Sequence, residues 1–200
     1  MCDCSAYILK AAPKFEMDAL VGTEFGKVSL EKNMADGKWT VLFFYPLNFT
    51  FVCPTEILGL NAAIPEFEKL NARVIGVSID SIFSHLAWTQ APSSLGGLGK
   101  TLAFPLGADV THSVSKAYRV ELEDGIATRG TFVIDPKGVL RWISIHPTEV
   151  GRNIDEIVRV VAALQVATDG TVCPVNWTPK AKTMQTTLES RNSTIAEMTQ

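Results

Sequence analysis

Cys53 stands where an apolar run gives way to a helical pattern, in the sequence Phe-Thr-Phe-Val-Cys-Pro-Thr-Glu. Pro54 suits the first position of a helix, because a missing N–H does no harm there and φ is already set. Glu56 suits the first turn, where negative charge interacts favourably with the helix dipole. We therefore expect Cys53 to be the N-cap of a helix, with free backbone N–H groups directed at its sulfur. Such an environment favours the thiolate, the reactive form of cysteine, and makes Cys53 a candidate nucleophile.

The alternative for Cys53 is a structural role, because free cysteines are among the most buried residues and usually fill space in a core. Three features favour the nucleophile instead. They are the position at a helix start, the flanking prolines Pro46 and Pro54, and Thr50 three residues upstream.

The composition is that of one well-buried domain with room for an arm or tail. The chain has 200 residues, of which 46% are hydrophobic, and a net charge of −3 from 18 basic and 21 acidic residues. This balance does not indicate binding to nucleic acid or to an anionic membrane. Residues 1–7 lack the features of a signal peptide, and no window is apolar for long enough to span a bilayer. Because four cysteines do not make a disulfide scaffold, we expect a cytoplasmic protein with mostly reduced thiols.

Three further patterns are assigned no function. Cys2 and Cys4 form a Cys-x-Cys pair, but no second pair follows at metal-ligand spacing, so a mobile tail is the simpler interpretation. The glycine-rich stretch 92–101 nearly matches a phosphate-binding loop, but Ser94 replaces the first glycine and a helix rather than a strand precedes it. The Asn-x-Ser/Thr triplets are attributed to chance, since a glycan on Asn48 would obstruct the Cys53 pocket.

The segments around Cys53 alternate between strand and helix patterns. Residues 40–45 and 73–79 are apolar runs that predict buried strands, and the helix-length connection between them indicates that they run parallel. Apolar residues after Cys53 follow the spacing of an amphipathic helix, in which Pro65 is expected to produce a bend rather than a loop. Residues 81–90 predict a second helix that begins after a polar cap, Ser81.

The rest of the chain supplies shorter strands, a hairpin and one clean helix. We expect a short strand at 28–30, an edge segment at 104–109, a short helix at 113–118, a hairpin of 130–135 with 139–145, and an amphipathic helix at 154–166. This order is typical of a thioredoxin-like α/β fold with a central mixed sheet flanked by helices. From Thr168 onward the chain is turn-rich and polar. We therefore divide it into a core domain, 1–167, and a C-terminal arm, 168–200.

Pro46, Thr50 and Cys53 together form the pattern Pro-x-x-x-Thr-x-x-Cys, which resembles the signature of the peroxiredoxins. The wider run around Cys53 is similar to that of the typical 2-Cys subgroup, and the similarity extends from about Ala11 to Trp177. The resemblance implies a thioredoxin-like fold and a thiol peroxidase that reduces hydrogen peroxide and organic hydroperoxides. It implies no metal, flavin or haem.

The resemblance also implies roles for residues around Cys53. Its thiolate would attack the terminal oxygen of a peroxide, and the leaving oxygen then needs hydrogen-bond donors. Thr50 would offer a hydroxyl, and Pro46 would shield the sulfur. Arg129 matches the family's active-site arginine, and its guanidinium keeps its charge at any working pH. Its structural alternative is a surface salt bridge.

Supporting residues are assigned on the same basis. Glu56 and Arg152 look like the family's pair that orients Arg129. Trp88, on the inner face of its predicted helix, is the remaining supporting residue.

Peroxide attack leaves a sulfenic acid on Cys53, and a second thiol can condense with it to a disulfide. Cys173, in Val-Cys-Pro-Val-Asn-Trp, matches the family's resolving cysteine, although Val175 and Asn176 replace the commoner Ala-Gly. The family implies that Cys173 of one subunit reaches Cys53 of its partner across a homodimer. It further implies a thioredoxin-type reductant and a decamer of five dimers, for which the sequence carries no specific signature. The alternative for Cys173 is an incidental exposed cysteine.

One departure from the family concerns inactivation by excess peroxide. Sensitive members carry a Gly-Gly-Leu-Gly stretch, which packs near the C-terminal segment, and a Tyr-Phe pair in a C-terminal helix. This chain has the first, at residues 96–99, but no Tyr-Phe after Trp177. Local unfolding around Cys53 should therefore be easier, and we predict moderate to high resistance to overoxidation.

Rival functions stay open on the residues alone. A thiol–disulfide oxidoreductase normally has Cys-x-x-Cys at the helix start, where this chain has Glu56 in the second position. A cysteine hydrolase would need support from a histidine and an Asn or Asp, and His85, His112 and His146 have no link to Cys53 in the sequence. From a different class, the alternative is an oligomeric holdase chaperone or a peroxide-signal relay. The activity of a pure chaperone would survive Cys53→Ser, whereas peroxide turnover would be abolished.

Overall fold

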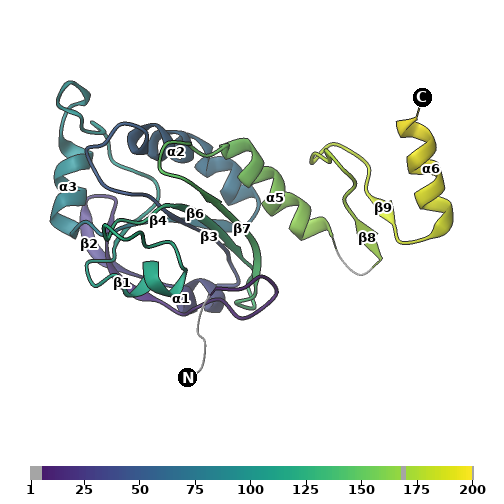
Figure 1. Cartoon of the computed structure of the whole chain (residues 1–200), viewed down its shortest axis with the longest axis horizontal. Coiled ribbons are helices and arrows are strands. Elements are labelled where there is room, and N and C mark those ends of the chain that lie inside the picture. The colour runs from purple at the N-terminus through teal and green to yellow at the C-terminus, as the bar shows by residue number, and fades with distance from the viewer. Residues whose placement is uncertain (1–5, 168–169, 200) are drawn as a thin grey trace. The chain divides into compact units, whose positions relative to one another are not determined.

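The computed structural model describes residues 6–167 and 170–199. The predictions for Cys2 and Cys4 therefore lie outside the described residues. Contacts divide the chain into an N-terminal unit, Met1–Ile154, and a C-terminal unit, Asp155–Gln200. Figure 1 shows the helices and strands of the two units.

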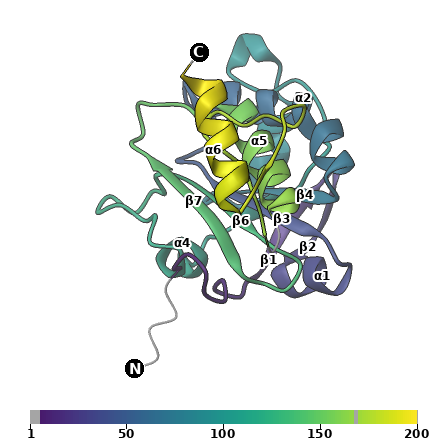
Figure 2. The ribbon, with the colours of Figure 1, turned by 90° about the vertical axis from the view of Figure 1, so that its right-hand side faces the viewer.

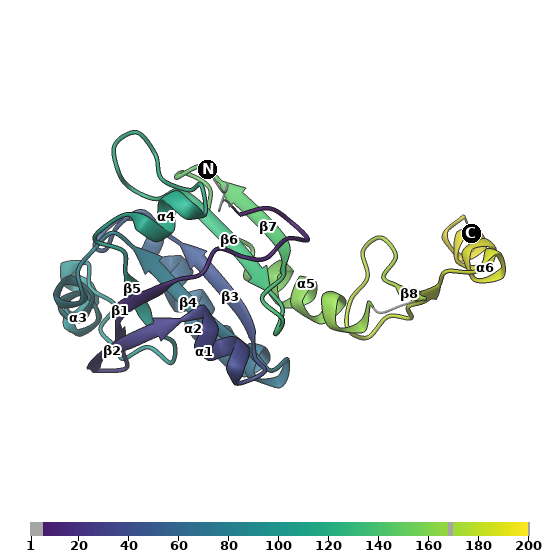
Figure 3. The same ribbon diagram turned by 90° about the horizontal axis from the view of Figure 1, so that it is seen from below.

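Within the described residues, seven strands of the N-terminal unit form one mixed sheet in the order β2-β1-β5-β4-β3-β6-β7. Figure 3 shows this order from β2 on the left to β7 on the right. β3 pairs parallel with β4, and β6 forms an antiparallel hairpin with β7, so both predicted pairings are confirmed. The strands are β1 (Glu16–Val21), β2 (Glu24–Ser29), β3 (Trp39–Phe44), β4 (Ala72–Ser78), β5 (Leu106–Ala108), β6 (Arg129–Ile134) and β7 (Leu140–His146).

The prediction that residues 104–109 form an edge segment is wrong. β5 lies inside the sheet, where it pairs parallel with β4 on one side and antiparallel with β1 on the other. The reason is the hairpin of β1 and β2, which adds beyond β5 and occupies the edge. The sequence pattern indicated only a short strand at 28–30 in that region.

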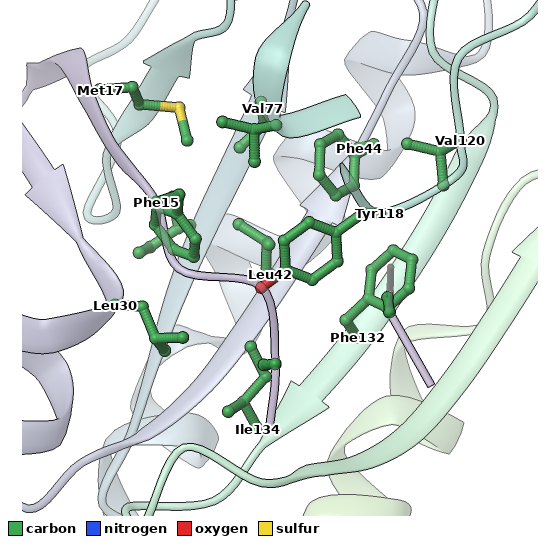
Figure 4. Packing of buried hydrophobic residues seen from close by; sticks show 14 of the residues in the cluster. Phe15, Met17, Leu30, Leu42, Phe44, Val77, Tyr118, Val120, Phe132 and Ile134 are labelled. Atoms are coloured by element: carbon green, nitrogen blue, oxygen red, sulfur yellow. The ribbon is translucent and has the colours of Figure 1, made fainter. Parts of the chain in front are cut away.

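One face of the sheet is covered by α1 (Leu30–Ala35) and α4 (Ser113–Ala117), and the other by α2 (Cys53–Lys69) (Figure 2). Strand side chains point alternately to the two faces. Leu42, Phe44 and Val77 therefore join one core cluster with Leu30 of α1 and Val114 of α4. Figure 4 shows the aromatic centre of this cluster, where the rings of Tyr118, Phe44 and Phe132 each contact the other two.

On the opposite face, α2 lies against β4 and buries the residues that the amphipathic pattern predicted, Ile57, Leu60, Ile64 and Phe67. The helix is continuous through Pro65, so no loop interrupts it. α3 (Ile82–Gln90) begins after the N-cap Ser81, whose hydroxyl accepts a hydrogen bond from the Ser84 N–H, as predicted. A short 3₁₀ helix, Ser93–Leu95, follows.

The C-terminal unit contains nearly all of α5 (Ile154–Val166), the short hairpin of β8 (Thr171–Val172) with β9 (Met184–Gln185), and α6 (Leu188–Met198). One face of α5 is buried, at Ile157, Val160, Val161 and Ala162. α6 starts with an acidic first turn and a Thr187 cap, but it buries none of its described residues. Its large apolar side chains, Leu188, Ile195 and Met198, are exposed.

Candidate active site

Strand register brings Cys53 and Arg129 to the same end of the sheet. β3 leads through residues 46–52 directly into α2, so the helix begins beyond the carboxyl end of β3. β6 runs antiparallel to β3 and pairs Phe43 with Thr131. Arg129, two residues earlier in β6, therefore lies beside the residues that follow the end of β3. Two segments 76 residues apart meet at one point.

Cys53 is the first residue of α2, and the prediction that it is the N-cap is wrong by one position. The N-cap is Val52, whose backbone is already helical at φ −82° and ψ −37°. The Val52 carbonyl accepts hydrogen bonds from the N–H groups of Thr55 and Glu56, at 3.0 and 3.3 Å. Cys53 stays in the first turn, where backbone N–H groups lack partners within the helix. Its side chain is fully buried, with 0% exposure.

Arg129 contacts the Cys53 sulfur directly. Its NH1 group donates to the Cys53 Sγ at 3.4 Å and also to Oε2 of Glu56 at 2.6 Å. Its Nε donates to the Thr148 carbonyl at 2.8 Å. The Arg129 side chain is 3% exposed, so it is not the surface salt bridge of the alternative interpretation. A buried guanidinium favours an anion on the sulfur, because charge-assisted hydrogen bonds are strong where water is excluded.

Glu56 lies between two arginines. Its Oε2 is 2.6 Å from Arg129 NH1 and 3.0 Å from Arg152 NH1, and its Oε1 accepts from the Arg152 backbone N–H at 2.9 Å. All three side chains are buried. Two guanidinium groups against one carboxylate leave a net charge of +1 beside the sulfur.

Arg152 is also held by the sheet. Its Nε donates to the Thr131 hydroxyl at 2.9 Å, its NH2 donates to the Phe44 carbonyl, and its guanidinium lies 5.1 Å from the Phe43 ring centroid. Burial, partly offset by the charge of Glu56, lowers the pKa of Arg152 to about 10. The guanidinium therefore keeps its charge at neutral pH, and Arg152 anchors Glu56 to β3 and β6.

The loop between β3 and α2 carries Pro46 and Thr50. Pro46 is buried and Thr50 is half-buried. The Thr50 hydroxyl donates to the Leu47 carbonyl at 3.0 Å, which leaves its lone pairs to accept a further hydrogen bond. Phe49 adopts a positive φ of 55°, so the loop turns sharply there.

A buried network that the sequence analysis missed fixes this loop. Asn48, 6% exposed, accepts from the Tyr45 hydroxyl at 2.9 Å, and its amide NH₂ contacts Ser84 Oγ at 2.9 Å and His85 Nδ1 at 3.1 Å. Its backbone N–H donates to Asp80 at 3.0 Å. The side chain is thus enclosed in the protein, which agrees with attributing its Asn-x-Thr triplet to chance.

His85 completes the network from α3. Its Nε2 lies 3.2 Å from the Gly107 carbonyl, so this nitrogen carries the proton and Nδ1 accepts from Asn48. The imidazole is fully buried, and burial lowers its pKa. No periodic signal could have revealed these contacts, because the residues lie 37 positions apart.

Trp88 lies behind the loop, on the inner face of α3 as predicted. Its ring is fully buried and stacks on Tyr45 at a centroid distance of 5.9 Å, with Phe49 at 6.2 Å. Its indole N–H donates to the Gly96 carbonyl at 3.1 Å. The next residue, Gly97, must be glycine, since a Cβ there would lie 2.0 Å from the Ala91 carbonyl oxygen.

Comparison with protein families decides the class. Residues 8–143 match the model of the AhpC/TSA family, and residues 163–195 match that of the C-terminal domain of 1-Cys peroxiredoxin. The chain belongs to the peroxiredoxin family.

Curated relatives and solved structures agree with this assignment. The chain is 51% identical to Peroxiredoxin-2 of Bos taurus over 92% of both chains, and 50% identical to Peroxiredoxin TSA1 of Saccharomyces cerevisiae over 92% of this chain and 93% of the other. The crystal structure of the reduced 2-Cys peroxiredoxin of Plasmodium vivax matches with a TM-score of 0.90 and 36% identity, covering 96% of this chain and 99% of that one. The AhpC of Mycobacterium tuberculosis matches with a TM-score of 0.74 and 37% identity, covering 86% and 99%. The predicted fold and the peroxidase class are thereby confirmed.

Cys173 lies in the C-terminal unit of this peroxiredoxin. It is a free thiol, as is Cys53, and it is partly buried. Its sulfur donates to the Ala163 carbonyl of α5 over 3.7 Å. Burial raises the pKa of the Cys173 thiol, and the charge of Arg159 opposes that rise. The predicted pairing of Cys53 with Cys173 concerns two subunits and stays a prediction.

Two further observations bear on other classes of site. The described residues contain no cluster of three or more His, Cys, Asp or Glu side chains that could hold a metal ion. Among the helices of the described segments, none combines the length and apolar character needed to cross a bilayer.

Proposed function

We propose that this peroxiredoxin reduces hydrogen peroxide and organic hydroperoxides through Cys53. The thiolate attacks the terminal oxygen, so that an S–O bond forms while the O–O bond breaks and its electron pair leaves with the alkoxide or hydroxide. A proton then converts the leaving group to an alcohol or water. The observation that carries the proposal is the buried contact of Arg129 with both the Cys53 sulfur and Glu56.

The surrounding residues suit this step. The net positive charge of Arg129, Glu56 and Arg152 stabilises the thiolate and the charge that moves onto the leaving oxygen. Because the Thr50 hydroxyl already donates to Leu47, it is available to accept the hydrogen of the incoming hydroperoxide. A bound peroxide would then find both kinds of hydrogen-bond partner, with Arg129 as donor and Thr50 as acceptor.

The second half of the proposed cycle uses Cys173. The Cys173 thiol of one subunit condenses with the Cys53 sulfenic acid of its partner in a homodimer, forming an S–S bond and releasing water. A thioredoxin-type reductant then reopens the disulfide, and five dimers assemble into a decamer. Because Cys53 is fully buried, the first turn of α2 must open before the two sulfurs can meet. In this proposal the core domain, 1–167, carries Cys53, and the C-terminal arm, 168–200, carries Cys173. The protein acts in the cytoplasm.

Resistance to overoxidation belongs to the same proposal. The residues after Trp177 include no tyrosine or phenylalanine, and α6 buries none of its described side chains. We therefore propose that the first turn of α2 opens without the restraint of a Tyr-Phe pair, so resolution competes well with further oxidation of the sulfenic acid.

Peroxide consumption coupled to a thioredoxin system tests the function. Cys53→Ser should abolish turnover, and Cys173→Ser should abolish the covalent dimer seen on non-reducing electrophoresis after one equivalent of peroxide. A wild type that stays monomeric on that gel would refute the intersubunit disulfide. A Cys53→Ser variant with full peroxidase activity would refute the mechanism as a whole.

A further inference from the structure

The loop that carries Cys173 is joined to α5 at two points. The Cys173 thiol donates to the Ala163 carbonyl over 3.7 Å, and Arg159 NH1 donates to the Trp177 carbonyl at 3.1 Å. Arg159 and Ala163 are four residues apart, so they lie on the same face of the helix. Both ends of the segment 173–177 are thus held by consecutive turns of α5.

The guanidinium of Arg159 is oriented by a partner on its own helix. Its Nε and NH2 donate to the two carboxylate oxygens of Glu156, the second at 2.7 Å, which leaves NH1 directed at the Trp177 carbonyl. The indole N–H of Trp177 is buried and has no hydrogen-bond partner in the described part of the chain. The polar contact that fixes this end of the loop is therefore the one from Arg159.

Arg159 also acts on Cys173 through its charge. Burial raises the pKa of the Cys173 thiol, whereas the nearby guanidinium favours the thiolate. The carboxylate of Glu156 faces the same guanidinium and reduces its field. In the resting protein the Cys173 thiol accordingly keeps its proton and donates a hydrogen bond to the Ala163 carbonyl. The charge of Arg159 then favours the loss of that proton when Cys173 reacts.

We propose that Arg159 is a positioning residue for the resolving thiol, which it serves by fixing the 173–177 loop to α5 and by supporting the negative charge that forms on Cys173. The inference rests on the resolving role proposed above. In that step the Cys173 thiol loses its proton, its sulfur attacks the sulfenic sulfur, the S–O bond breaks, and the departing hydroxide takes a proton to become water. No other reactant is required.

The test separates the two thiol reactions by rapid mixing of the reduced full-length protein with peroxide. Arg159→Gln removes both the positive charge and the guanidinium that pairs with Glu156 through two hydrogen bonds. Arg159→Lys keeps the charge but loses that bidentate pair. Arg191→Gln is the matched control, because it removes one positive charge from α6, where Arg191 contacts Asn192. Sulfenic acid and disulfide are quantified by mass spectrometry after acid quench, at several pH values.

We expect disulfide formation in Arg159→Gln to slow by up to about fivefold, the size expected when one partly exposed charge interaction is lost, while sulfenic acid forms at the wild-type rate. The midpoint of its pH–rate profile should move to higher pH. In Arg159→Lys the pH–rate profile of disulfide formation should keep the wild-type midpoint but reach a lower maximal rate. In Arg191→Gln both the midpoint and the maximal rate should match the wild type. A loop held for structural reasons alone would lower the plateau in both Arg159 variants without moving either midpoint, and that result overturns the electrostatic part.

Wild-type disulfide kinetics in Arg159→Gln, at every pH, would overturn the inference entirely. This outcome is distinct from failure of the proposed function, which Cys173→Ser reports. If Cys173→Ser still yields the same covalent dimer, the resolving role itself is wrong. If Cys173→Ser loses the dimer and Arg159→Gln forms it normally, only the role of Arg159 is wrong.

Discussion

Glu56→Gln should be among the most damaging single-atom changes available in this protein. In the wild type, Oε2 faces the NH1 groups of Arg129 and Arg152, while Oε1 accepts the Arg152 backbone N–H. An amide has one oxygen and one NH₂, so either orientation sets an NH₂ donor against a donor of Arg129 or Arg152. The substitution also leaves two buried guanidinium groups without their shared carboxylate.

Removal of one member of a buried charge cluster costs about 3–5 kcal/mol. That loss is large against a total free energy of unfolding of about 5–15 kcal/mol. At about 2–4 °C per kcal/mol for a chain of this size, the midpoint of thermal unfolding should fall by about 6–20 °C. Second-order reaction of Cys53 with peroxide should slow as well, because Arg129 loses the partner that aims NH1 at the sulfur.

Thermal unfolding of the reduced protein, followed by circular dichroism at one fixed concentration, measures the effect. Glu66→Gln is the matched control, since Glu66 lies on the same helix and pairs with Lys69 at 2.7 Å with both side chains more than half exposed. Its effect should stay below about 1 kcal/mol. If Glu56→Gln and Glu66→Gln unfold within 2 °C of each other, the buried charge cluster does not stabilise the fold and the reasoning fails.

Three other outcomes are expected. Arg129→Lys should slow sulfenic acid formation by about 10²-fold in stopped-flow measurements, because a compact ammonium lacks the planar fork whose separate nitrogens reach Cys53, Glu56 and the Thr148 carbonyl; a rate within threefold of the wild type would contradict the assignment. Asn48→Ala should lower the free energy of unfolding by about 2–4 kcal/mol in urea titrations, since it leaves buried polar partners unsatisfied. The lowered pKa of His85 means that the unfolded state binds its proton first, so stability is full above pH of about 6.5 and is lost as pH falls below it; His85→Gln should remove that part of the slope between about pH 5 and 7.

Much of the fold is readable in the sequence, because buried strands and amphipathic helices leave periodic signals. The run at 40–45 and the pattern after Cys53 located β3 and α2 to within a residue or two. The sequence does not place β5 inside the sheet, because its three residues carry no information about which strands flank them. The partner strand β1 was not recognised, although Met17, Ala19 and Leu20 are buried in it.

The candidate site, too, has a part that the sequence indicates and a part that it does not. Arg129, Glu56 and Arg152 were assigned from family resemblance, and the structure brings them together around Cys53. The Asn48 network could not be assigned from the sequence, since isolated polar residues on separate elements carry no spacing rule. A fully buried His85 beside a functional loop is recognisable only once α3 is placed against the sheet.

The two thiols of the proposed cycle each lie near an arginine, and the carboxylates decide how they differ. Beside Cys53, one carboxylate is shared by two guanidinium groups, so a positive charge is left for the sulfur. Beside Cys173, Glu156 pairs with Arg159 one to one, so the field is nearly neutral and burial keeps the sulfur protonated. Of these two sulfurs, the one beside the net positive charge is Cys53, which fits the peroxide-attacking role proposed for it. In the proposed cycle Cys173 would react afterwards, as the thiol that condenses with the Cys53 sulfenic acid.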